Sequence, residues 1–439
     1  MGDTAKTSDR LIRDPQATLR EFEDCTLLFH PLFAETVGLT PVGEAIWHAL
    51  DRGRNPSEVA VEVRAQFDGA PDEVEEDVRT FLADLKRRGF VREEAKLTAK
   101  PSPTPLSPPS PNIGRGRGLG EGEGFPAFSL ALGDGNRFTI RAGDAKAAEV
   151  MEFFARASGL STAEPETRHG RDLLVVSDGI TPVGEAQAIC ALLPRDAARI
   201  RGRQLDEQGQ IRLISEPLNP NNWLWQQLAR LSAFIGAQAQ GTGGVLLHSG
   251  LAEYRPHLIP PSPFPSPQRG GEGGKGVEEG SGILLAGRSG VGKTTAAKRL
   301  PPPWRSLCDD VALVVRDPED GYRAHPLPTW SRFFGPEAGD GSDTWDMQRA
   351  TPLRAIFVLE QGKQDRVEAM GIGQAVALLA ELARQTSTFL LKGWSLDEIA
   401  LFHRQRFENL CALAETVPSY LLDMSRQGAF WEDIAGVIE

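Results

Sequence analysis

The carboxyl-terminal half of this chain is organised around the stretch Gly287-Arg288-Ser289-Gly290-Val291-Gly292-Lys293-Thr294-Thr295. This stretch satisfies G-x-x-x-x-G-K-[ST], the pattern of a phosphate-binding P-loop. The apolar run 283–286 before it predicts a buried strand, and residues 296–300 after it favour a helix. Strand, glycine loop and helix is the order that phosphate binding requires. The alternative is a glycine-rich strand-to-helix turn that binds nothing.

Each part of the loop predicts a contact with a nucleotide. Its glycines let backbone N–H groups turn toward phosphate oxygens, and the start of the following helix adds partial positive charge. We expect Lys293 to reach the β- and γ-phosphates and the Thr294 hydroxyl to ligate Mg²⁺. The predicted cofactors are therefore ATP and Mg²⁺. The predicted nucleotide-binding residues are Gly287, Ser289, Gly290, Val291, Gly292, Lys293, Thr294 and Thr295.

Two adjacent carboxylates, Asp309 and Asp310, lie between two short apolar runs downstream of the loop. This placement suits a Walker-B-like pair. One carboxylate would bind Mg²⁺, directly or through water, and the other would accept a proton from an attacking hydroxyl. The alternative is an Asp-Asp turn between two strands. Lys293, Asp309 and Asp310 are the predicted catalytic residues.

Composition excludes several classes of protein. The chain has 439 residues, of which 40% are hydrophobic and 25% charged, which is an ordinary balance for two or three globular domains. Its net charge of −12 argues against binding to nucleic acid through a basic surface. The 4 cysteines are far apart and form no C-x-x-C, which indicates reduced thiols in a cytoplasm. No signal peptide or membrane-spanning run is visible, so we expect a cytoplasmic protein without a membrane partner.

The amino-terminal residues 22–94 predict a small domain of their own. Two β-prone runs broken at Pro31 predict a hairpin, and three helical segments follow over 40–50, 56–67 and 71–88. This region resembles the PqqD-like family of small winged-helix-like peptide chaperones. The matching residues are Thr40-Pro41-Val42-Gly43-Glu44-Ala45-Ile46-Trp47, Asp77-Val78, Phe81-Leu82, Leu85 and Gly89-Phe90-Val91.

The resemblance implies that this α+β domain binds the leader of a precursor peptide along a strand edge in the Leu27–Leu39 region. We expect Trp47 in the core rather than on the peptide. The alternative is a generic helical domain with a hairpin. Residues 95–125 are rich in Pro and Gly and predict a linker, and a similar insertion is predicted at 260–280. A proline ligand for a partner is the other interpretation of these two segments.

A second resemblance covers the predicted domain 126–439. Leu247-His248-Ser249-Gly250, the loop 287–295 and Cys308-Asp309-Asp310 resemble the HPr serine kinase family, whose catalytic fold is related to phosphoenolpyruvate carboxykinase. Residues 300–310 and 324–331 are closer still to the ScmC family of the SynChlorMet peptide-modification cassette. The resemblance implies an α/β P-loop domain that binds ATP and Mg²⁺ and transfers phosphate to a hydroxyl.

The same resemblance assigns roles to individual residues. Lys293 matches the phosphate position, Thr294 and Asp309 match the metal positions, and Asp310 matches the base. The Glu-Arg-Gly element of HPr kinases is missing, which argues against HPr itself as the substrate. Weaker candidates are His325 as a substrate contact, and Arg349 and Arg354 as phosphate clamps. The alternatives are a packed loop histidine and salt-bridged or solvated arginines.

The sequence thus predicts a kinase-like protein of a ribosomal-peptide modification pathway. It would bind a leader peptide at its amino-terminal domain and phosphorylate a Ser or Thr hydroxyl. The alternative is a non-catalytic nucleotide-binding scaffold that presents the peptide to other modifying enzymes. The sequence leaves the oligomeric state open, with a homo-oligomer among the options. Two features of the sheet are also predicted. The strand at 245–248 is expected beside that at 283–286, and an edge strand is expected at 418–422.

Overall fold

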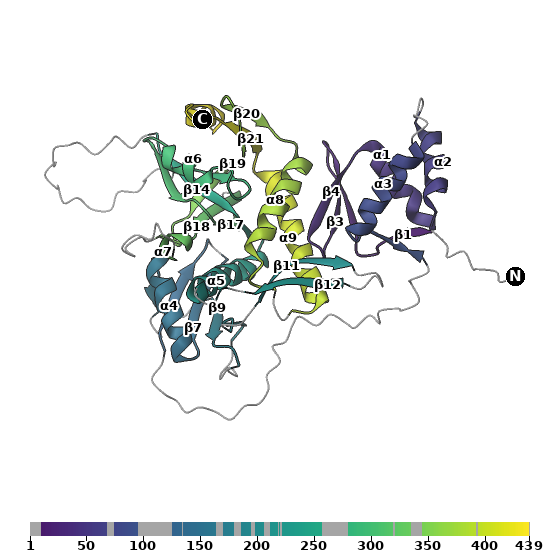
Figure 1. The fold of residues 1–439 in the computed structure, drawn as a ribbon. Helices are drawn as coiled ribbons and strands as arrows, with labels where there is room; N and C mark the ends of the chain where they lie inside the picture. Colours follow the sequence, from purple (N-terminus) through teal and green to yellow (C-terminus); the bar gives the residue numbers. More distant parts are fainter. Residues whose placement is uncertain are drawn as a thin grey trace.

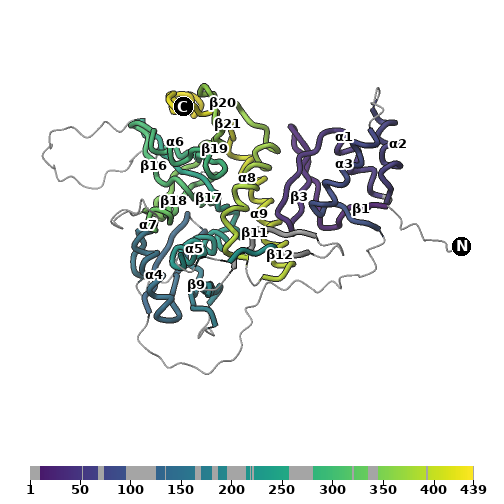
Figure 2. Tube along the Cα trace, viewed as in Figure 1, coloured from purple at the N-terminus to yellow at the C-terminus, as the bar shows by residue number. Residues whose placement is uncertain are grey.

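The structure is a computed structural model that describes most of the chain as a set of packed helices and sheets (Figures 1 and 2). The described residues are 10–67, 74–94, 125–133, 135–163, 170–179, 186–194, 198–205, 211–217, 219, 222–256, 280–318, 321–334, 345–391 and 394–438. The predicted linker, apart from its last residue, and the predicted insertion, apart from residue 280, lie outside these ranges. None of the described helices combines the length and the hydropathy needed to cross a bilayer.

The amino-terminal domain pairs a small antiparallel sheet with three helices. Its sheet has the order β2-β3-β4, and a separate ladder joins β1 to β5. The strands are β1 (Leu11–Arg13), β2 (Thr18–Glu21), β3 (Thr26–His30), β4 (Glu35–Leu39) and β5 (Val91–Glu93). The helices are α1 (Pro41–Ala49), α2 (Pro56–Gln66) and α3 (Val74–Arg87), with a 3₁₀ turn η1 (Leu50–Arg52). The predicted hairpin is confirmed as β3 and β4. Trp47 is 2% exposed and lies in the core, as predicted.

A second sheet follows, with the order β10-β9-β7-β6-β8. Its strands are β6 (Ala127–Ala131), β7 (Arg137–Ala142), β8 (Ser161–Thr162), β9 (Arg171–Val176) and β10 (Ala188–Ala191). The other elements of this region are α4 (Ala145–Ala157), the hairpin β11 (Ala198–Leu205) and β12 (Ile211–Pro217), and α5 (Trp223–Gln240). Its core continues into the next sheet, because Leu246, Leu313 and Val315 pack in the same apolar cluster as α4 and α5.

The third and largest sheet contains the predicted loop strand. Its order is β13-β17-β18-β19-β15-β14-β16, and β21 pairs with both β19 and β20. The strands are β13 (Val245–Leu247), β14 (Ser249–Tyr254), β15 (Ser281–Ala286), β16 (Trp304–Cys308), β17 (Ala312–Asp317), β18 (Gly321–Pro326), β19 (Thr351–Gln361), β20 (Arg366–Ala369) and β21 (Ser419–Met424). The helices are α6 (Lys293–Arg299), α7 (Ser331–Phe334), α8 (Ile372–Thr386), α9 (Leu396–Thr416) and α10 (Phe430–Ile438).

Strand β15 is buried on both faces, as its continuous apolar run predicts. Leu284 and Ala286 belong to the cluster that includes α8 and α9 side chains, whereas Ile283 and Leu285 belong to the cluster with α6 and α10. Adjacent residues of a strand point to opposite faces, so both faces of this strand need apolar side chains. The sheet is thus enclosed between two layers of helices, and the described chain is a mixed α/β structure.

Two predicted strand neighbours are corrected by the structure. The strand at 245–247 pairs with β17, and it is β14, after the intervening His248, that pairs with β15. The strand at 419–424 is not at an edge, because β19 and β20 pair with its two sides. In both cases the local apolar pattern located the strand, while its partner depends on residues distant in the sequence.

Strand directions bring several chain segments to one edge of the large sheet. β14 is antiparallel to both β15 and β16, so β15 and β16 run the same way, and β19 and β21 run parallel with them. The carboxyl ends of these four strands and the amino end of β14 therefore lie together at one end of the sheet. The glycine loop (residues 287–295), the pair Asp309 and Asp310, and His248 all lie at this end. Ligands of α/β proteins bind beyond the carboxyl ends of such strands.

The amino-terminal domain packs directly against α8 and α9 (Figure 1). Every residue of β3 is buried: Leu28 faces its own domain's core, while Leu27 and Phe29 pack with residues of α8 and α9. Asp24 accepts hydrogen bonds from the backbone N–H groups of Gly373 (2.8 Å) and Gln374 (3.0 Å), and so caps α8 from another domain.

Candidate active site

The glycine loop joins β15 to α6 through backbone geometry that only glycine adopts without strain. Gly292 has a φ of +114° and forms the N-cap of α6, which has no side-chain cap. A residue with a Cβ would be strained there. The first N–H groups of α6 therefore lie beside the loop without a side-chain cap. The sequence pattern of strand, loop and helix is confirmed as local structure.

Lys293 lies folded back over the loop. Its Nζ donates hydrogen bonds to the carbonyl oxygens of Gly287 (2.7 Å) and Arg288 (3.1 Å), and the residue is 6% exposed. Burial lowers the pKa of the Lys293 ammonium, while the nearby carboxylates of Asp310 and Asp309 oppose that shift. The structure thus brings together all three predicted catalytic residues.

Asp309 is a fixed and buried carboxylate. One oxygen accepts a hydrogen bond from Thr329 Oγ1 (2.6 Å), and the other accepts one from the Arg332 guanidinium (2.8 Å). Burial alone would raise its pKa, but the bonds from Thr329, Arg332 and the Thr294 hydroxyl outweigh burial and lower it. Asp309 therefore stays ionised, and it contacts Thr294, its predicted partner in metal binding.

Asp310 belongs to a chain of polar groups that the sequence did not predict. Its Oδ1 lies 3.2 Å from His248 Nε2, and His248 Nδ1 lies 2.8 Å from Gln385 Oε1. Gln385 Nε2 in turn donates to Glu381 at 3.4 Å. The His248 ring therefore bridges the Gln385 amide and the half-exposed Asp310 carboxylate.

The sequence indicated only some of the residues in this row of polar groups. His248 stands within the resembling segment Leu247–Gly250, just before a strand, but its role is visible only once β14 is paired with β15. Gln385 has no motif around it. It reaches the site because α8 lies across the end of the sheet, and no local pattern predicts that contact.

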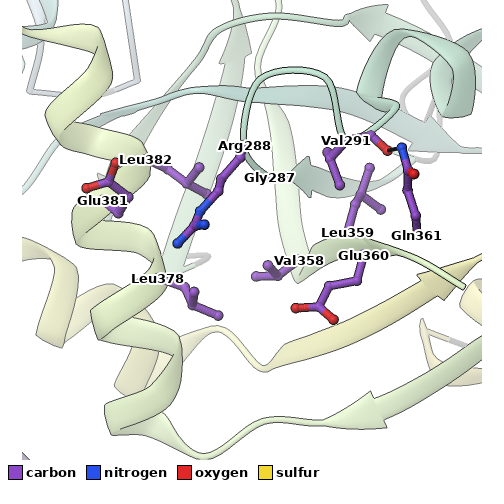
Figure 3. A pocket seen from close by; sticks show the side chains of 10 residues that line it. All are labelled: Gly287, Arg288, Val291, Val358, Leu359, Glu360, Gln361, Leu378, Glu381 and Leu382. Atoms are coloured by element: carbon purple, nitrogen blue, oxygen red, sulfur yellow. Dashed lines mark hydrogen bonds between the residues drawn. The ribbon is translucent and has the colours of Figure 1, made fainter. Parts of the chain in front are cut away.

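In the described part of the chain, cavities border the glycine loop on several sides. One of about 340 Å³ lies between the loop, the end of β19 and α8, and Figure 3 shows the Arg288 side chain extending into this space. A second, of about 650 Å³, borders Thr295, Arg299 and the segment after β21. The third, of about 380 Å³, borders Ser289 and Asp310. The loop thus has space on several sides.

The weaker candidates have structural partners or lie apart from the site. His325 is fully buried, bonds the carbonyl of Met347 (2.8 Å), and has a pKa that burial lowers to about 4, so it is neutral. Arg349 pairs with the buried carboxylate of Glu253. Arg354 is exposed on β19. The alternatives of a packed histidine, a salt-bridged arginine and a solvated arginine describe these residues.

Two family models match the chain. Residues 25–91 match Coenzyme PQQ synthesis protein D (PqqD), and residues 275–439 match SynChlorMet cassette protein ScmC. The chain joins a PqqD-like domain to a ScmC domain. The predicted resemblances to the PqqD-like and ScmC families are confirmed, the latter over residues 275–439. The predicted resemblance to HPr serine kinases and the start of that domain at residue 126 stay predictions. No curated protein matches the chain.

The two matched ranges supply different parts of the molecule: one contains most of the candidate site, and the other contains strands that pack against the first. The ScmC domain contains the glycine loop, the acidic pair and the whole of α8 and α9. The PqqD-like domain contains β3 and β4, which pack on α8, and β3 also contacts α9. His248 precedes the ScmC match. Within the described ranges, no group of three His, Cys, Asp or Glu side chains is arranged to hold a metal ion by itself.

Proposed function

We propose that this chain is an ATP-dependent phosphotransferase that binds the leader of a ribosomal precursor peptide and phosphorylates a Ser or Thr hydroxyl on it. Its catalytic domain would be an HPr kinase/PEP carboxykinase-like P-loop domain. One observation supports the proposal most strongly. Lys293, the Thr294–Asp309 pair and the Asp310–His248 pair meet at one edge of the sheet, although three separate chain segments supply them.

The glycine loop fits a nucleotide phosphate chain. Its glycine backbone and the uncapped start of α6 offer N–H donors, and Lys293 supplies a cation within the same loop. The cavity of about 650 Å³ beside Thr295 and Arg299 has room for the nucleoside. Lys293 would exchange its bonds to the loop carbonyls for phosphate oxygens, which its flexible side chain allows.

The residues present also fit Mg²⁺. This ion favours one or two carboxylates together with substrate phosphates and water rather than an all-protein cage. Asp309, ionised and in contact with Thr294, supplies the carboxylate and the hydroxyl for such a site. Bound Mg²⁺ would neutralise charge on the transferring phosphoryl group. Thr329 and Arg332 would hold Asp309 in place.

Asp310 is suited to act as the general base. Its carboxylate is half-exposed beside the loop, and it can accept the proton that the acceptor hydroxyl loses as its oxygen attacks phosphorus. His248, held by Gln385, fixes the position of that carboxylate. A positioned base of this kind typically contributes ~10²–10⁴-fold to the rate.

The PqqD-like domain would bring the peptide to this site. The end strand β4 has an exposed residue, Gly38, and the carbonyl of Thr36 accepts a hydrogen bond from Arg88 (2.9 Å). A leader pairing with β4 would displace Arg88 and use the main-chain groups of that edge. Because the domain is packed on α8, a bound leader raises the concentration of the attached acceptor near the ScmC domain.

One contact favours the alternative of a nucleotide-binding scaffold. The Lys293 ammonium donates hydrogen bonds to two loop carbonyls and so already stabilises the loop. A lysine with this structural role suits a protein that binds a nucleotide without catalysing a reaction. The two functions are separated by incubating the full chain with ATP, Mg²⁺ and the precursor peptide encoded nearby, followed by mass spectrometry of the peptide and quantification of ADP. The kinase predicts one added phosphoryl group per peptide and an equal amount of ADP. The scaffold predicts bound peptide and nucleotide with neither product.

A further inference from the structure

The cavity of about 380 Å³ beside Asp310 has two ends of different chemistry. One end carries Ser289 of the glycine loop, Asp310 and His248. The remainder is walled by α5, by the segment after β18 and by the segment after α8. Its aromatic members are Trp225, Trp330 and Phe389. Four uncharged polar residues also line it: Ser232, Gln385, Thr386 and Thr388. A cavity with large apolar walls and a small number of polar groups is the usual form of a ligand-binding site.

The aromatic walls are fixed by their own contacts. Trp225 and Phe389 meet edge to face with ring centroids 5.4 Å apart, and Trp330 donates its indole N–H to Ser232 Oγ at 3.0 Å. The indole N–H of Trp330 is therefore already used, and its ring presents an apolar surface. Rigid aromatic surfaces of this kind bind apolar side chains well.

The charge distribution restricts the occupant. Of the residues that line this cavity, Asp310 and His248 are the ionisable ones, and both lie at the loop end. The cavity in Figure 3 differs, because Arg288, Glu360 and Glu381 all line it. A charged side chain in the aromatic part of the 380 Å³ cavity would lose hydration without gaining a partner.

We propose that this cavity binds a large apolar side chain, aromatic or branched aliphatic, two residues from the acceptor Ser or Thr of the peptide. The inference rests on the proposed function and specifies its substrate. The acceptor hydroxyl reaches Asp310 at the polar end. In an extended peptide, side chains two positions apart lie on the same face, so a neighbour at that spacing enters the aromatic part.

The domain arrangement supports a peptide as the occupant. Gln385 and Thr386 at the end of α8 line the cavity, and β4 packs along the same helix. Asp24 contacts the start of α8, and Thr26, which follows it closely, pairs with Leu39 at the far end of β4. Glu35, the first residue of β4, therefore lies toward the end of α8 that borders the cavity. A leader that pairs antiparallel to β4 would leave the sheet at Glu35 and place the following segment beside the cavity.

The first test locates the side chain without requiring turnover. The probes are peptides Gly-Gly-Ser-Gly-X-Gly-Gly and their reversed order, with X as the photoreactive residue benzoylphenylalanine. After irradiation with the full chain, digestion and mass spectrometry, we expect cross-links to the segments that contain Trp225 or Phe389. Cross-links confined to other segments would overturn the inference.

A matched pair of variants controls for general damage. Ala229 and Ala237 are both half-buried on α5 and pack on the same core, but only Ala229 lines the cavity. Ala229→Leu should reduce the cross-link at least about fivefold, and Ala237→Leu should leave it unchanged at equal thermal stability. Equal yields in the two folded variants would contradict occupancy of the cavity.

The second test measures selectivity with the same peptides and X as Phe, Leu, Ala, Lys or Glu. We expect kcat/KM to be at least about tenfold higher for Phe and Leu than for Lys and Glu, the scale of discrimination by apolar pockets. Transfer that is indifferent to X would overturn the inference and leave the kinase intact. Cross-linking in the cavity without any transfer would support a site for the apolar side chain there and contradict phosphoryl transfer to the hydroxyl two residues away.

Discussion

Phe29 of β3 stacks on Phe407 of α9, with ring centroids 4.2 Å apart and ring planes within 2° of parallel. This contact joins the PqqD-like domain to the ScmC domain, because the two residues lie in the two different matched ranges. It covers a sheet face that would expose Leu27 and Phe29 if the PqqD-like domain stood alone. The PqqD-like domain and the domain that carries the candidate active site are therefore parts of one packed unit.

Phe407→Ala should loosen this contact. Loss of a buried aromatic ring costs about 3–5 kcal/mol of the free energy of unfolding, which urea denaturation measures. Hydrogen exchange should become faster in β3 and in the first half of α8, while α3 keeps its protection. Leu401→Ala on the same helix is the control, since Leu401 is 47% exposed. Unchanged exchange in β3 would show that the domains do not depend on this contact.

Asp24→Ala should destabilise α8 by about 1 kcal/mol, the usual contribution of an N-cap. Burial raises the pKa of Asp24, but the hydrogen bonds from the N–H groups of Gly373 and Gln374 lower it by more, so the net shift is downward. The stabilisation is therefore present above the unfolded pKa of about 3.9 and is lost as the pH falls through the lower folded value. Glu23→Ala, an exposed neighbour, should have no effect. A difference between wild type and Asp24→Ala that does not become smaller as the pH falls below about 3.9 would contradict this cap.

His325 should make the protein less stable in mild acid. It is neutral when folded because burial lowers its pKa to about 4, whereas the unfolded histidine titrates near 6.5. The unfolded state binds more protons between these values, so stability falls from pH 6.5 to 4, by about 3 kcal/mol at most. His325→Gln should flatten this part of the stability profile, and His48→Gln, an exposed control, should not. The same slope in both variants would exclude His325 as the cause.

Lys293→Ala should weaken the thermal stabilisation that ATP and Mg²⁺ produce, because it removes the buried ammonium group of the glycine loop. Differential scanning fluorimetry over a range of ATP concentrations measures the effect. Lys298→Ala is the matched control, since Lys298 lies exposed on the same helix. If wild type and Lys293→Ala respond equally to ATP, the glycine loop does not hold the phosphates through this lysine.

Local sequence patterns predicted where strands and helices lie better than they predicted which elements pair with each other. The apolar run before Gly287 located β15, and the two β-prone runs around Pro31 located the hairpin, because both signals lie within a few residues. The pairing of β14 with β15 and the contact of His248 with Gln385 depend on residues far apart in the sequence. A single sequence does not specify such distances, so these features emerged only from the fold.

The interface between the two domains was also not predictable from the sequence. The side chains of Leu27 and Phe29 fit an ordinary strand of a small domain, and nothing near them indicates a second apolar partner. Their partners are α9 and the first half of α8. At the start of α8, Gly373 permits close approach because a Cβ there would lie 2.4 Å from Cys25 Sγ. A glycine next to a helix start has many explanations, and only the packed structure selects this one.

The most direct test of the proposed kinase is a single-turnover measurement with γ-labelled ATP, Mg²⁺ and the precursor peptide encoded nearby. The account predicts label on a peptide Ser or Thr with the wild type. It predicts a rate at least ~10²-fold lower for Asp310→Asn, with ATP binding retained, because only the base is lost. Asp433→Asn, an exposed control, should match the wild type. Equal rates for wild type and Asp310→Asn would contradict the role of Asp310, and an unlabelled peptide with the wild type would contradict the kinase itself.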